Sequence, residues 1–400
     1  MGFQTTLITN LFHLKQGTYL SPSQMKKSWS QEFCYPVYGA NGVIGFSNRK
    51  MYSERTTLVS CRGANCGVIH YTKPNAWISN NSIACIPKAE VDPTFYYYLC
   101  SNSIFNDVIT GSAQPQITIT NLSSKKLIHP PLPTQKKIAG ILSAYDDAIE
   151  NNLRRIKLLE EMAQITYEEW FVRLRFPGHA TTPTNEATGL PDRWKHGSLG
   201  DLVEFQNGYA FKGEDFKDDG FPVIKIKNIG NNTVDISDTD FVDSKVANVA
   251  SKFKLDEGDL LIAMTGATIG KTGFLPFSSK PCYLNQRVGK FLRKKDSNNI
   301  HYIFAAIGGD RGLQQVLGLA SGAAQPNISG SQILSLKCIV PSKEILSKYN
   351  LLMQSNFGLI LGFVRQNQRL REARDILLPR LMTGVIDAEK YQPENFLKKN

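Results

Sequence analysis

The chain has 400 residues, of which 42% are hydrophobic and 20% are charged. This composition is typical of globular proteins and excludes wholesale disorder and fibrous repeats. At about 150 residues per domain, the length predicts two or three folded units. No apolar run approaches the roughly 20 residues of a membrane-spanning helix, so we expect a cytoplasmic protein that makes no contact with a membrane.

Charge and cysteine usage narrow the class further. The formal net charge is +11, and residues 1–136 carry 12 basic side chains but only 5 acidic ones. This surplus favours a polyanionic partner such as nucleic acid. The 7 cysteines are odd in number and include no Cys-x-x-Cys pair, and the 6 histidines are scattered, so we expect reduced thiols and no metal site.

The strongest pattern along the chain is an internal repeat whose period is about half the chain. Segments of the first half return in the same order in the second: residues 15–17 (KQG) with 206–208 (QNG), 35–37 (YPV) with 221–223 (FPV), 57–67 (TLVSCRGANCG) with 260–270 (LLIAMTGATIG), 80–81 (NN) with 285–286 (NQ), and 111–117 (GSAQPQI) with 322–328 (GAAQPNI). Chance does not produce such an ordered series. The chain therefore consists of two tandem units.

Each unit begins with short β-branched and aromatic runs separated by Gly, Asn and Pro. Residues 117–120 (ITIT) and 221–226 (FPVIKI) are examples, and they predict strands. Each unit then changes to a long helical pattern after a proline boundary, at residues 130–133 (PPLP) and at Pro341, with Ser342 placed to cap the second helix.

The two helical patterns carry apolar residues at alternating steps of four and three, the spacing of a coiled-coil seam. The first seam comprises Ile138, Leu142, Tyr145, Ile149, Asn152, Ile156, Leu159, Ala163, Thr166 and Trp170. The second comprises Ile345, Tyr349, Leu352, Asn356, Leu359, Phe363, Gln366, Leu370, Ala373 and Leu377. We expect a helix pair about 50 Å long rather than two ordinary amphipathic core helices. Asn152 and Gln366 either fix its register or lie at a solvated edge.

These patterns predict an α+β fold in which two tandem mixed α/β domains are each followed by a long helix, with the two helices packed as an antiparallel coiled coil. The predicted boundaries are residues 1–136 for domain 1, 137–175 for the central helix, 176–193 for a Pro/Gly/Thr-rich connector, 194–341 for domain 2, 342–384 for the C-terminal helix and 385–400 for a tail.

The sequence lacks motifs for cofactor binding and catalysis. Residues 265–272 (TGATIGKT) approach a phosphate-binding loop, but they have three residues between the glycines where that loop has four, and the first repeat (residues 63–67) lacks the lysine. We interpret both segments as structural turns. No dinucleotide-binding fingerprint and no amino-methyltransferase tetrad is present, so we expect no cofactor and no catalytic residue in this chain.

Over nearly its whole length the chain resembles the specificity subunit of type I restriction-modification enzymes. The resemblance rests on the order of the repeated segments and on four further stretches: residues 35–45 (YPVYGANGVIG), 170–178 (WFVRLRFPG), 199–202 (LGDL) and 378–384 (LPRLMTG). It implies a non-catalytic subunit whose two target recognition domains each read one half of a bipartite, asymmetric DNA sequence.

The same resemblance implies the partners. The helices of such a subunit form a spacer and dock two methyltransferase subunits, which restriction and translocase subunits join. S-adenosylmethionine, ATP and Mg²⁺ are then cofactors of those partners and not of this chain.

Candidate DNA contacts are chosen by chemistry, because target domains of this family differ in the residues that read bases. Lys and Arg near Gly/Asn-rich turns neutralise phosphates, and Arg pairs with guanine. The candidates are Arg49, Lys50, Arg62 and Lys73 in domain 1 and Lys225, Lys227, Lys271, Arg287 and Arg293 in domain 2. The alternative for each is a solvated surface charge.

Two other functions are compatible with parts of the sequence. A self-contained DNA-modifying enzyme would bind S-adenosylmethionine itself, which calorimetry detects. A two-headed scaffold would bind protein or RNA, and salt-dependent binding to random DNA duplexes compared with RNA separates it from a DNA reader.

Overall fold

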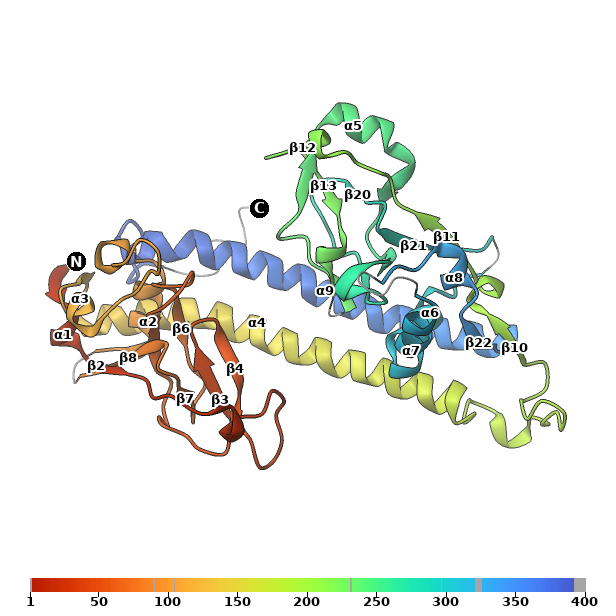
Figure 1. The fold of residues 1–400 in the computed structure, drawn as a ribbon, viewed down its shortest axis with the longest axis horizontal. Helices are drawn as coiled ribbons and strands as arrows, with labels where there is room; N and C mark the ends of the chain where they lie inside the picture. The colour runs from red at the N-terminus through yellow and green to blue at the C-terminus, as the bar shows by residue number, and fades with distance from the viewer. Residues whose placement is uncertain are drawn as a thin grey trace. The chain divides into compact units, whose positions relative to one another are not determined.

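The computed structural model describes residues 2–88, 91–103, 105–230, 232–295, 297–320 and 326–391. The chain divides into two compact units: unit 1 comprises Met1–Ile149 and Arg369–Asn400, and unit 2 comprises Glu150–Gln368. Two long helices, α4 (Leu132–Tyr167) and α9 (Lys343–Met382), each contribute one segment to each unit (Figure 1). Each unit therefore combines a globular domain with a segment of both long helices.

Unit 1 contains three sheets and short helices in addition to its segments of the two long helices. Its described elements before α4 are β1 (Gln4–Leu7), α1 (Ile8–Leu11), β2 (Phe12–Gln16), η1 (Pro22–Gln24), β3 (Tyr35–Gly39), β4 (Gly42–Ser47), β5 (Thr57–Ser60), β6 (Ile69–Tyr71), β7 (Trp77–Ile78), β8 (Ser82–Pro87), α2 (Pro93–Ser101), η2 (Asn106–Val108), α3 (Ile119–Ser123) and β9 (Lys126–His129). The sheets have the strand orders β2-β8-β5-β6, β4-β3-β7 and β1-β9.

Unit 2 has more strands. After η3 (Glu168–Val172) and η4 (His179–Thr181), its described elements are β10 (Lys195–Ser198), η5 (Leu199–Asp201), β11 (Val203–Asn207), η6 (Gly213–Asp215), β12 (Phe216–Lys217), β13 (Phe221–Ile224), η7 (Ile226–Asn228), β14 (Ile229–Gly230), β15 (Asn232–Val234), β16 (Asp240–Val242), α5 (Ser244–Val249), η8 (Ser251–Phe253), β17 (Lys254–Leu255), β18 (Leu260–Ala263), η9 (Gly266–Thr268), β19 (Thr272–Phe274), β20 (Cys282–Leu284), β21 (Val288–Arg293), α6 (Ile300–Gly308), α7 (Asp310–Leu319), α8 (Gly330–Leu334) and β22 (Lys337–Val340). The sheets have the orders β11-β21-β18-β19-β15-β14, β12-β16-β13-β20-β17 and β10-β22.

The two units share one topology. The order β2-β8-β5-β6 of unit 1 returns as β11-β21-β18-β19, β4-β3-β7 returns as β16-β13-β20, and β1-β9 returns as β10-β22. The pairs β3·β7 and β13·β20 are both parallel, although their neighbouring pairs are antiparallel. The repeat in the sequence is therefore a repeat of the fold, to which unit 2 adds further strands and α7.

Prolines and short polar side chains set the local boundaries. Helix α4 begins at Leu132, before residue 137 where the sequence places it, because Pro133 lies in the first turn, where an N–H has no partner within the helix. Ser342 precedes α9, and its Oγ accepts from the backbone N of Ile345 at 3.5 Å. The predicted strand at residues 117–120 is wrong: Thr118 caps helix α3, because its hydroxyl accepts from the N of Asn121 at 3.1 Å.

In unit 2 the long helices contact each other through buried polar side chains. Asn152 is 5% exposed, and its Nδ2 donates to Oε1 of Gln366 at 3.1 Å and to Oδ1 of Asn367 at 2.9 Å. Seven residues further along α4, the backbone oxygen of Leu159 accepts from Nδ2 of Asn356 at 3.0 Å. Later residues of α4 thus meet earlier residues of α9, so the segments run antiparallel, and Asn152 does not lie at a solvated edge.

In unit 1 the helix segments share one core with the domain. Ile138 and Leu142 of α4 belong to the same buried cluster as Leu377 and Leu381 of α9. The cluster also includes Tyr98 of α2, so the domain and both helices are packed together in this unit.

The predicted first seam is buried along most of its length. Ile138, Leu142, Ile149 and Ile156 are buried, and Tyr145 and Leu159 are half-buried.

Part of the predicted second seam is wrong. Ile345 and Tyr349 are buried and Phe363 and Leu370 are half-buried, but Leu352 and Leu359 are 46% and 55% exposed. Met353 and Ile360 take their places, because they pack in the core that α9 shares with the domain of unit 2. Apolar residues are adjacent at 352–353 and at 359–360, so spacing alone cannot choose between them.

Candidate nucleic-acid interface

The repeated Gly-x-x-x-Gly segments are tight turns held by the repeated Gln-Pro segments. In unit 1 the N–H of Gly63 donates to the carbonyl of Pro115 at 3.0 Å, and the N–H of Ile117 donates to the carbonyl of Cys61 at 3.0 Å. Both Gly63 (φ 80°) and Gly67 (φ 91°) have left-handed backbone that favours glycine. We call residues 63–67 the glycine turn of unit 1.

Unit 2 repeats these hydrogen bonds one for one. The N–H of Gly266 donates to the carbonyl of Pro326 at 3.0 Å, and the N–H of Ile328 donates to the carbonyl of Met264 at 2.9 Å. Gly266 and Gly270 again have left-handed φ values, of 74° and 80°. Residues 266–270 are the glycine turn of unit 2. Within the repeat at 322–328, residues 322–325 lie outside the described residues.

In the glycine turn of unit 2, the backbone N–H groups form hydrogen bonds within the domain. The N–H groups of Gly266, Ile269, Gly270 and Lys271 all donate to backbone carbonyls. None of these four amides is available to a phosphate, so the geometry confirms the interpretation of this segment as a structural turn.

Two further glycines fix where the neighbouring loops meet. A Cβ atom on Gly17 would lie 2.1 Å from the carbonyl oxygen of Ser79, and one on Gly208 would lie 2.1 Å from that of Asn285. These matching approaches explain why both repeats have Gly after the strand. They also correct one pair in the sequence repeat. Because Ser79 corresponds to Asn285, residues 80–81 correspond to 286–287 and not to 285–286, as the sequence pattern suggests.

The basic candidates of unit 1 lie on loops and have no acidic partner. Arg49, Lys50, Arg62 and Lys73 are all exposed, and none forms an ion pair within the described residues. Nζ of Lys50 donates to Oδ1 of Asn75 at 2.9 Å, which places it near Lys73. Arg62 precedes the glycine turn instead. The four candidates thus lie at two places on the domain.

Two candidates of unit 2 are neutralised by aspartates. Nζ of Lys225 lies 3.1 Å from Oδ2 of Asp240 and 3.5 Å from the centre of the Phe216 ring, and Nζ of Lys227 lies 3.2 Å from Oδ1 of Asp238 and 3.5 Å from Oδ2 of Asp240. Burial opposes ionisation of Asp240, but hydrogen bonds and charge from the two lysines outweigh it and lower the pKa of this carboxyl. Both lysines therefore serve the domain's own structure.

The other candidates of unit 2 are exposed. Lys271 follows the glycine turn, and the carbonyl of Arg287 accepts from the N–H of Met264 at 3.0 Å, so these two cations flank the turn. Arg293 lies at the other end of β21, opposite Val203 of β11. The structure thus brings Lys271 and Arg287 together and separates Arg293 from them.

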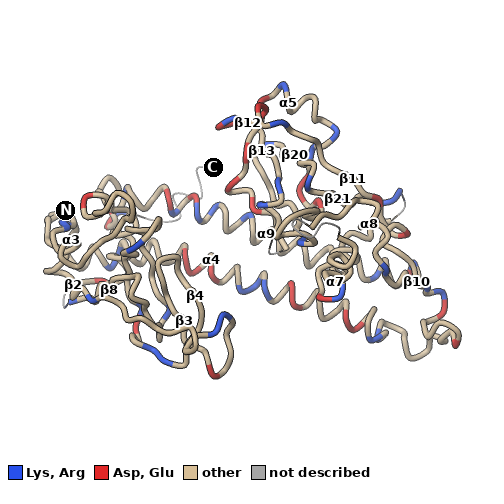
Figure 2. The backbone as a smooth tube through the Cα atoms, viewed as in Figure 1, with Lys and Arg blue, Asp and Glu red and all other residues tan. Residues whose placement is uncertain are grey.

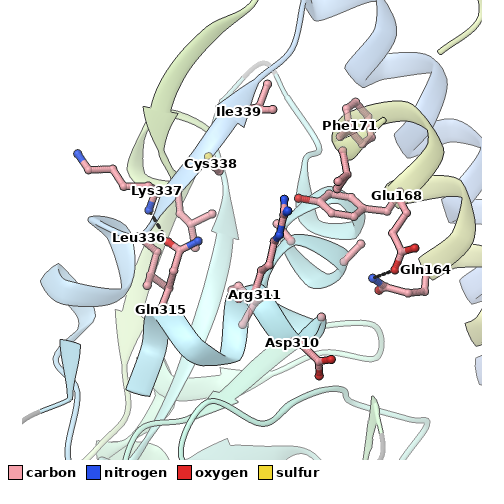
Figure 3. A pocket seen from close by; sticks show the side chains of 18 of the residues that line it. Gln164, Glu168, Phe171, Asp310, Arg311, Gln315, Leu336, Lys337, Cys338 and Ile339 are labelled. Atoms are coloured by element: carbon pink, nitrogen blue, oxygen red, sulfur yellow. Dashed lines mark hydrogen bonds between the residues drawn. The ribbon is translucent and has the colours of Figure 1, made fainter. Parts of the chain in front are cut away.

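Sequence reasoning missed a cavity in unit 2 of about 570 Å³. Figure 3 shows Arg311 of α7 reaching into it, between the end of α4 and β22. At its walls Nε2 of Gln164 donates to Oε1 of Glu168 at 3.2 Å, and the backbone N of Lys337 donates to Oε1 of Gln315 at 3.0 Å. No sequence signal marks this cavity, because its walls come from four separate segments of the chain.

Within the described ranges no group of three His, Cys, Asp or Glu side chains could hold a metal ion. No helix in that part of the chain is both long enough and apolar enough to cross a membrane.

Comparison with known proteins identifies both repeats. A family model described as the type I restriction modification DNA specificity domain matches residues 2–161 and 191–357. The chain is 24% identical over 354 residues to the type I restriction enzyme MjaVIII specificity subunit of Methanocaldococcus jannaschii, covering 87% of this chain and 83% of the relative. It is 27% identical over 333 residues to the HindI specificity subunit of Haemophilus influenzae, covering 68% and 71%.

The fold has a match among solved structures. The crystal structure of the S subunit of a type I restriction-modification system from M. genitalium aligns with a TM-score of 0.61 and 18% identity, covering 95% of this chain and 96% of that one. Because the family model matches both repeats and most of the chain, the chain belongs to the family of type I restriction-modification specificity subunits.

Proposed function

We propose that this chain is the non-catalytic DNA-reading subunit of a type I restriction-modification complex, with the domain of each unit reading one half of a bipartite, asymmetric duplex target. The observation that carries the proposal is the repeat of one topology with different exposed side chains. Equivalent hydrogen bonds hold both glycine turns, yet the turns present Arg62 in unit 1 and Lys271 with Arg287 in unit 2. One scaffold with two different surfaces suits a reader of two different half-sites.

We also propose that α4 and α9 form an antiparallel coiled coil that sets the distance between the half-sites. The antiparallel contacts in unit 2, the core that both helices share in unit 1 and the buried Asn152 support this role. Buried polar side chains between two helices can fix their register.

The reactive chemistry is proposed to belong to partner subunits. Two methyltransferase subunits would bind S-adenosylmethionine and methylate adenine, and restriction/translocase subunits would use ATP and Mg²⁺. In the relatives, the name "type I restriction enzyme specificity subunit" describes one part of a larger enzyme. This supports an assembly in which this chain recognises the DNA sequence and its partners catalyse the reactions.

The test is methylome sequencing of cells that carry the chain with its methyltransferase partners. We expect one bipartite motif with a fixed gap. Deleting one heptad from α4 and one from α9 shortens the helices by about 10 Å and should shorten the gap by about three base pairs. An unchanged gap would refute the spacer role, and methylation at a single undivided site would refute the two-reader function.

A further inference from the structure

Unit 1 carries a tryptophan whose side chain is largely exposed. Trp29 is 60% exposed and lies between η1 and β3. The other three tryptophans are engaged: Nε1 of Trp77 donates to the carbonyl of Thr18 at 3.0 Å, Trp194 is 6% exposed, and the Trp170 ring packs 5.7 Å from Tyr349. A single exposed aromatic side chain is common at protein surfaces, so the case for a binding site at Trp29 depends on the charged residues around it.

The loop that carries Trp29 has a defined shape. Lys26 pairs with Phe46 of β4 through two backbone hydrogen bonds of 2.9 and 2.8 Å, which ties the start of the loop to the sheet. The end of the loop is a turn in which Ser30 N donates to the carbonyl of Phe33 at 3.1 Å and Phe33 N donates to Oγ of Ser30 at 3.0 Å. Trp29 is therefore presented by a fixed loop.

Two cations lie in this loop and two more follow the end of β4, while the loop also carries one acidic side chain, the exposed Glu32. Lys26 and Lys27 precede Trp29, and Arg49 and Lys50 follow the end of β4, the strand to which Lys26 is bonded. All four are exposed, and none forms an ion pair in the described part of the chain. Figure 2 shows both basic and acidic segments on the loops near β3 and β4. We call Lys26, Lys27, Trp29, Arg49 and Lys50 the Trp29 surface.

The topologically equivalent segment of unit 2 has a net negative charge. Residues 208–220 connect β11 to β13 as residues 17–34 connect β2 to β3. They carry four acidic side chains, Glu214, Asp215, Asp218 and Asp219, against two lysines. The Trp29 surface is thus a property of unit 1 and not of the shared fold.

We propose that the Trp29 surface is a duplex DNA contact through which unit 1 holds its half-site, with the indole lying against the DNA and the four cations neutralising phosphates. The inference rests on the proposed function and adds a specific contact to it. Positive charge that is not paired with carboxylates complements a polyanion, and an indole offers both an apolar face and an N–H donor. An acidic protein would also complement this positive charge, so the test must distinguish such a protein from duplex DNA.

The test uses the full chain and a random-sequence duplex of 40 base pairs, with acrylamide quenching of tryptophan fluorescence as the readout. DNA should shield part of the emission in the wild type, and Trp29→Phe should abolish the shielding, because the remaining tryptophans are bonded or packed. Trp29→Ala should weaken binding by about tenfold, because the apolar area that the indole buries against the DNA is lost. Lys26→Gln/Lys27→Gln should reduce the slope of log affinity against log salt by about 1 to 2.

A matched control removes two exposed lysines from α4, Lys136→Gln/Lys157→Gln, and should leave affinity and salt slope unchanged. If the wild type binds duplex DNA but Trp29 stays open to acrylamide, the inference is overturned and the proposed function survives. Shielding of Trp29 by a purified methyltransferase partner, and not by DNA, overturns it as well. If the wild type and its complex with that partner bind no duplex DNA, both proposals fall together.

Discussion

Replacing Asp146 by alanine removes the carboxylate that joins the domain of unit 1 to both long helices. Asp146 lies on α4, accepts a hydrogen bond from the hydroxyl of Tyr98 on α2 at 2.5 Å, and accepts another from the guanidinium of Arg374 on α9. Tyr98 is 4% exposed, and the side chain of Arg374 is 25% exposed. The substitution therefore leaves a buried hydroxyl without its acceptor and a largely buried cation without one of its carboxylates.

The size of the effect follows from these contacts. A hydrogen bond to a charged group contributes about 1.5–3 kcal/mol, and breaking a fully buried ion pair costs about 3–5 kcal/mol. Arg374 is not fully buried and keeps Oδ1 of Asp375 at 2.8 Å, which lowers the second contribution. We expect Asp146→Ala to destabilise unit 1 by about 3 kcal/mol, or about 6–12 °C in Tm for a unit of this size. Asp146→Asn, which still offers Tyr98 an oxygen, should cost about half as much.

The assay combines thermal unfolding by circular dichroism with amide hydrogen exchange of α2, so that unit 1 is followed separately. The control is Asp375→Ala, since that side chain is 61% exposed and also pairs with Arg374. A surface ion pair contributes about 1 kcal/mol or less. Equal destabilisation by Asp146→Ala and Asp375→Ala, or faster exchange in neither, would refute the view that Asp146 fastens the domain to the helices.

Two further predictions concern unit 2. Burial and then the charge of Arg293 lower the pKa of His301 to about 4, whereas the unfolded chain takes up this proton near pH 6.5, so stability should fall as pH drops from 6.5 to 4. His301→Phe keeps the stacking on Phe357, so in this variant the free energy of unfolding should fall by about 2–3 kcal/mol less between pH 6.5 and pH 4 than in the wild type. Urea titrations at several pH values measure this difference. The same pH dependence in both proteins would contradict the assignment to His301. Gly208→Ala should cost more than about 3 kcal/mol, because its Cβ meets a backbone oxygen, while Gly213→Ala, with open space, should be near neutral; equal melting temperatures contradict this.

How much the sequence predicts depends on the kind of constraint. The glycine turns were predictable because backbone that needs a positive φ leaves a Gly at a fixed place in each repeat, as at Gly63 and Gly266. In the first helical seam, positions such as Tyr145 and Ile156 have no large apolar neighbour in the sequence, so the spacing selects them. The second seam was not predictable, because adjacent apolar residues such as Leu352 and Met353 compete, and only packing against the domain decides which is buried.

The candidate contacts show a different limit. Composition and turn chemistry selected Lys225 and Lys227 as readily as Lys50, but the carboxylate of Asp240 neutralises the first two and nothing comparable pairs with the third in the described residues. Ion pairing depends on strand pairing that brings separate segments together, here β13 and β16. Trp29 was missed for the opposite reason: a lone aromatic residue in a polar loop has no periodicity, and its meaning comes from its exposure and its neighbours.

Comparison of the two units therefore distinguishes the contacts that stabilise the fold from the surface residues that differ between the units. Hydrogen bonds at the glycine turns recur with nearly the same lengths, and the Gly17 and Gly208 approaches are the same, so the scaffold tolerates little change at these places. Beyond these glycines, the segments after β2 and β11 differ in charge: the first carries two lysines and one glutamate, with Trp29, and the second carries four acidic side chains and two lysines. If each unit holds half of one duplex, this divergence assigns the larger, salt-dependent share of the affinity to unit 1. Unit 2, with Lys271 and Arg287 beside its glycine turn, must then depend more on close fit than on bulk charge.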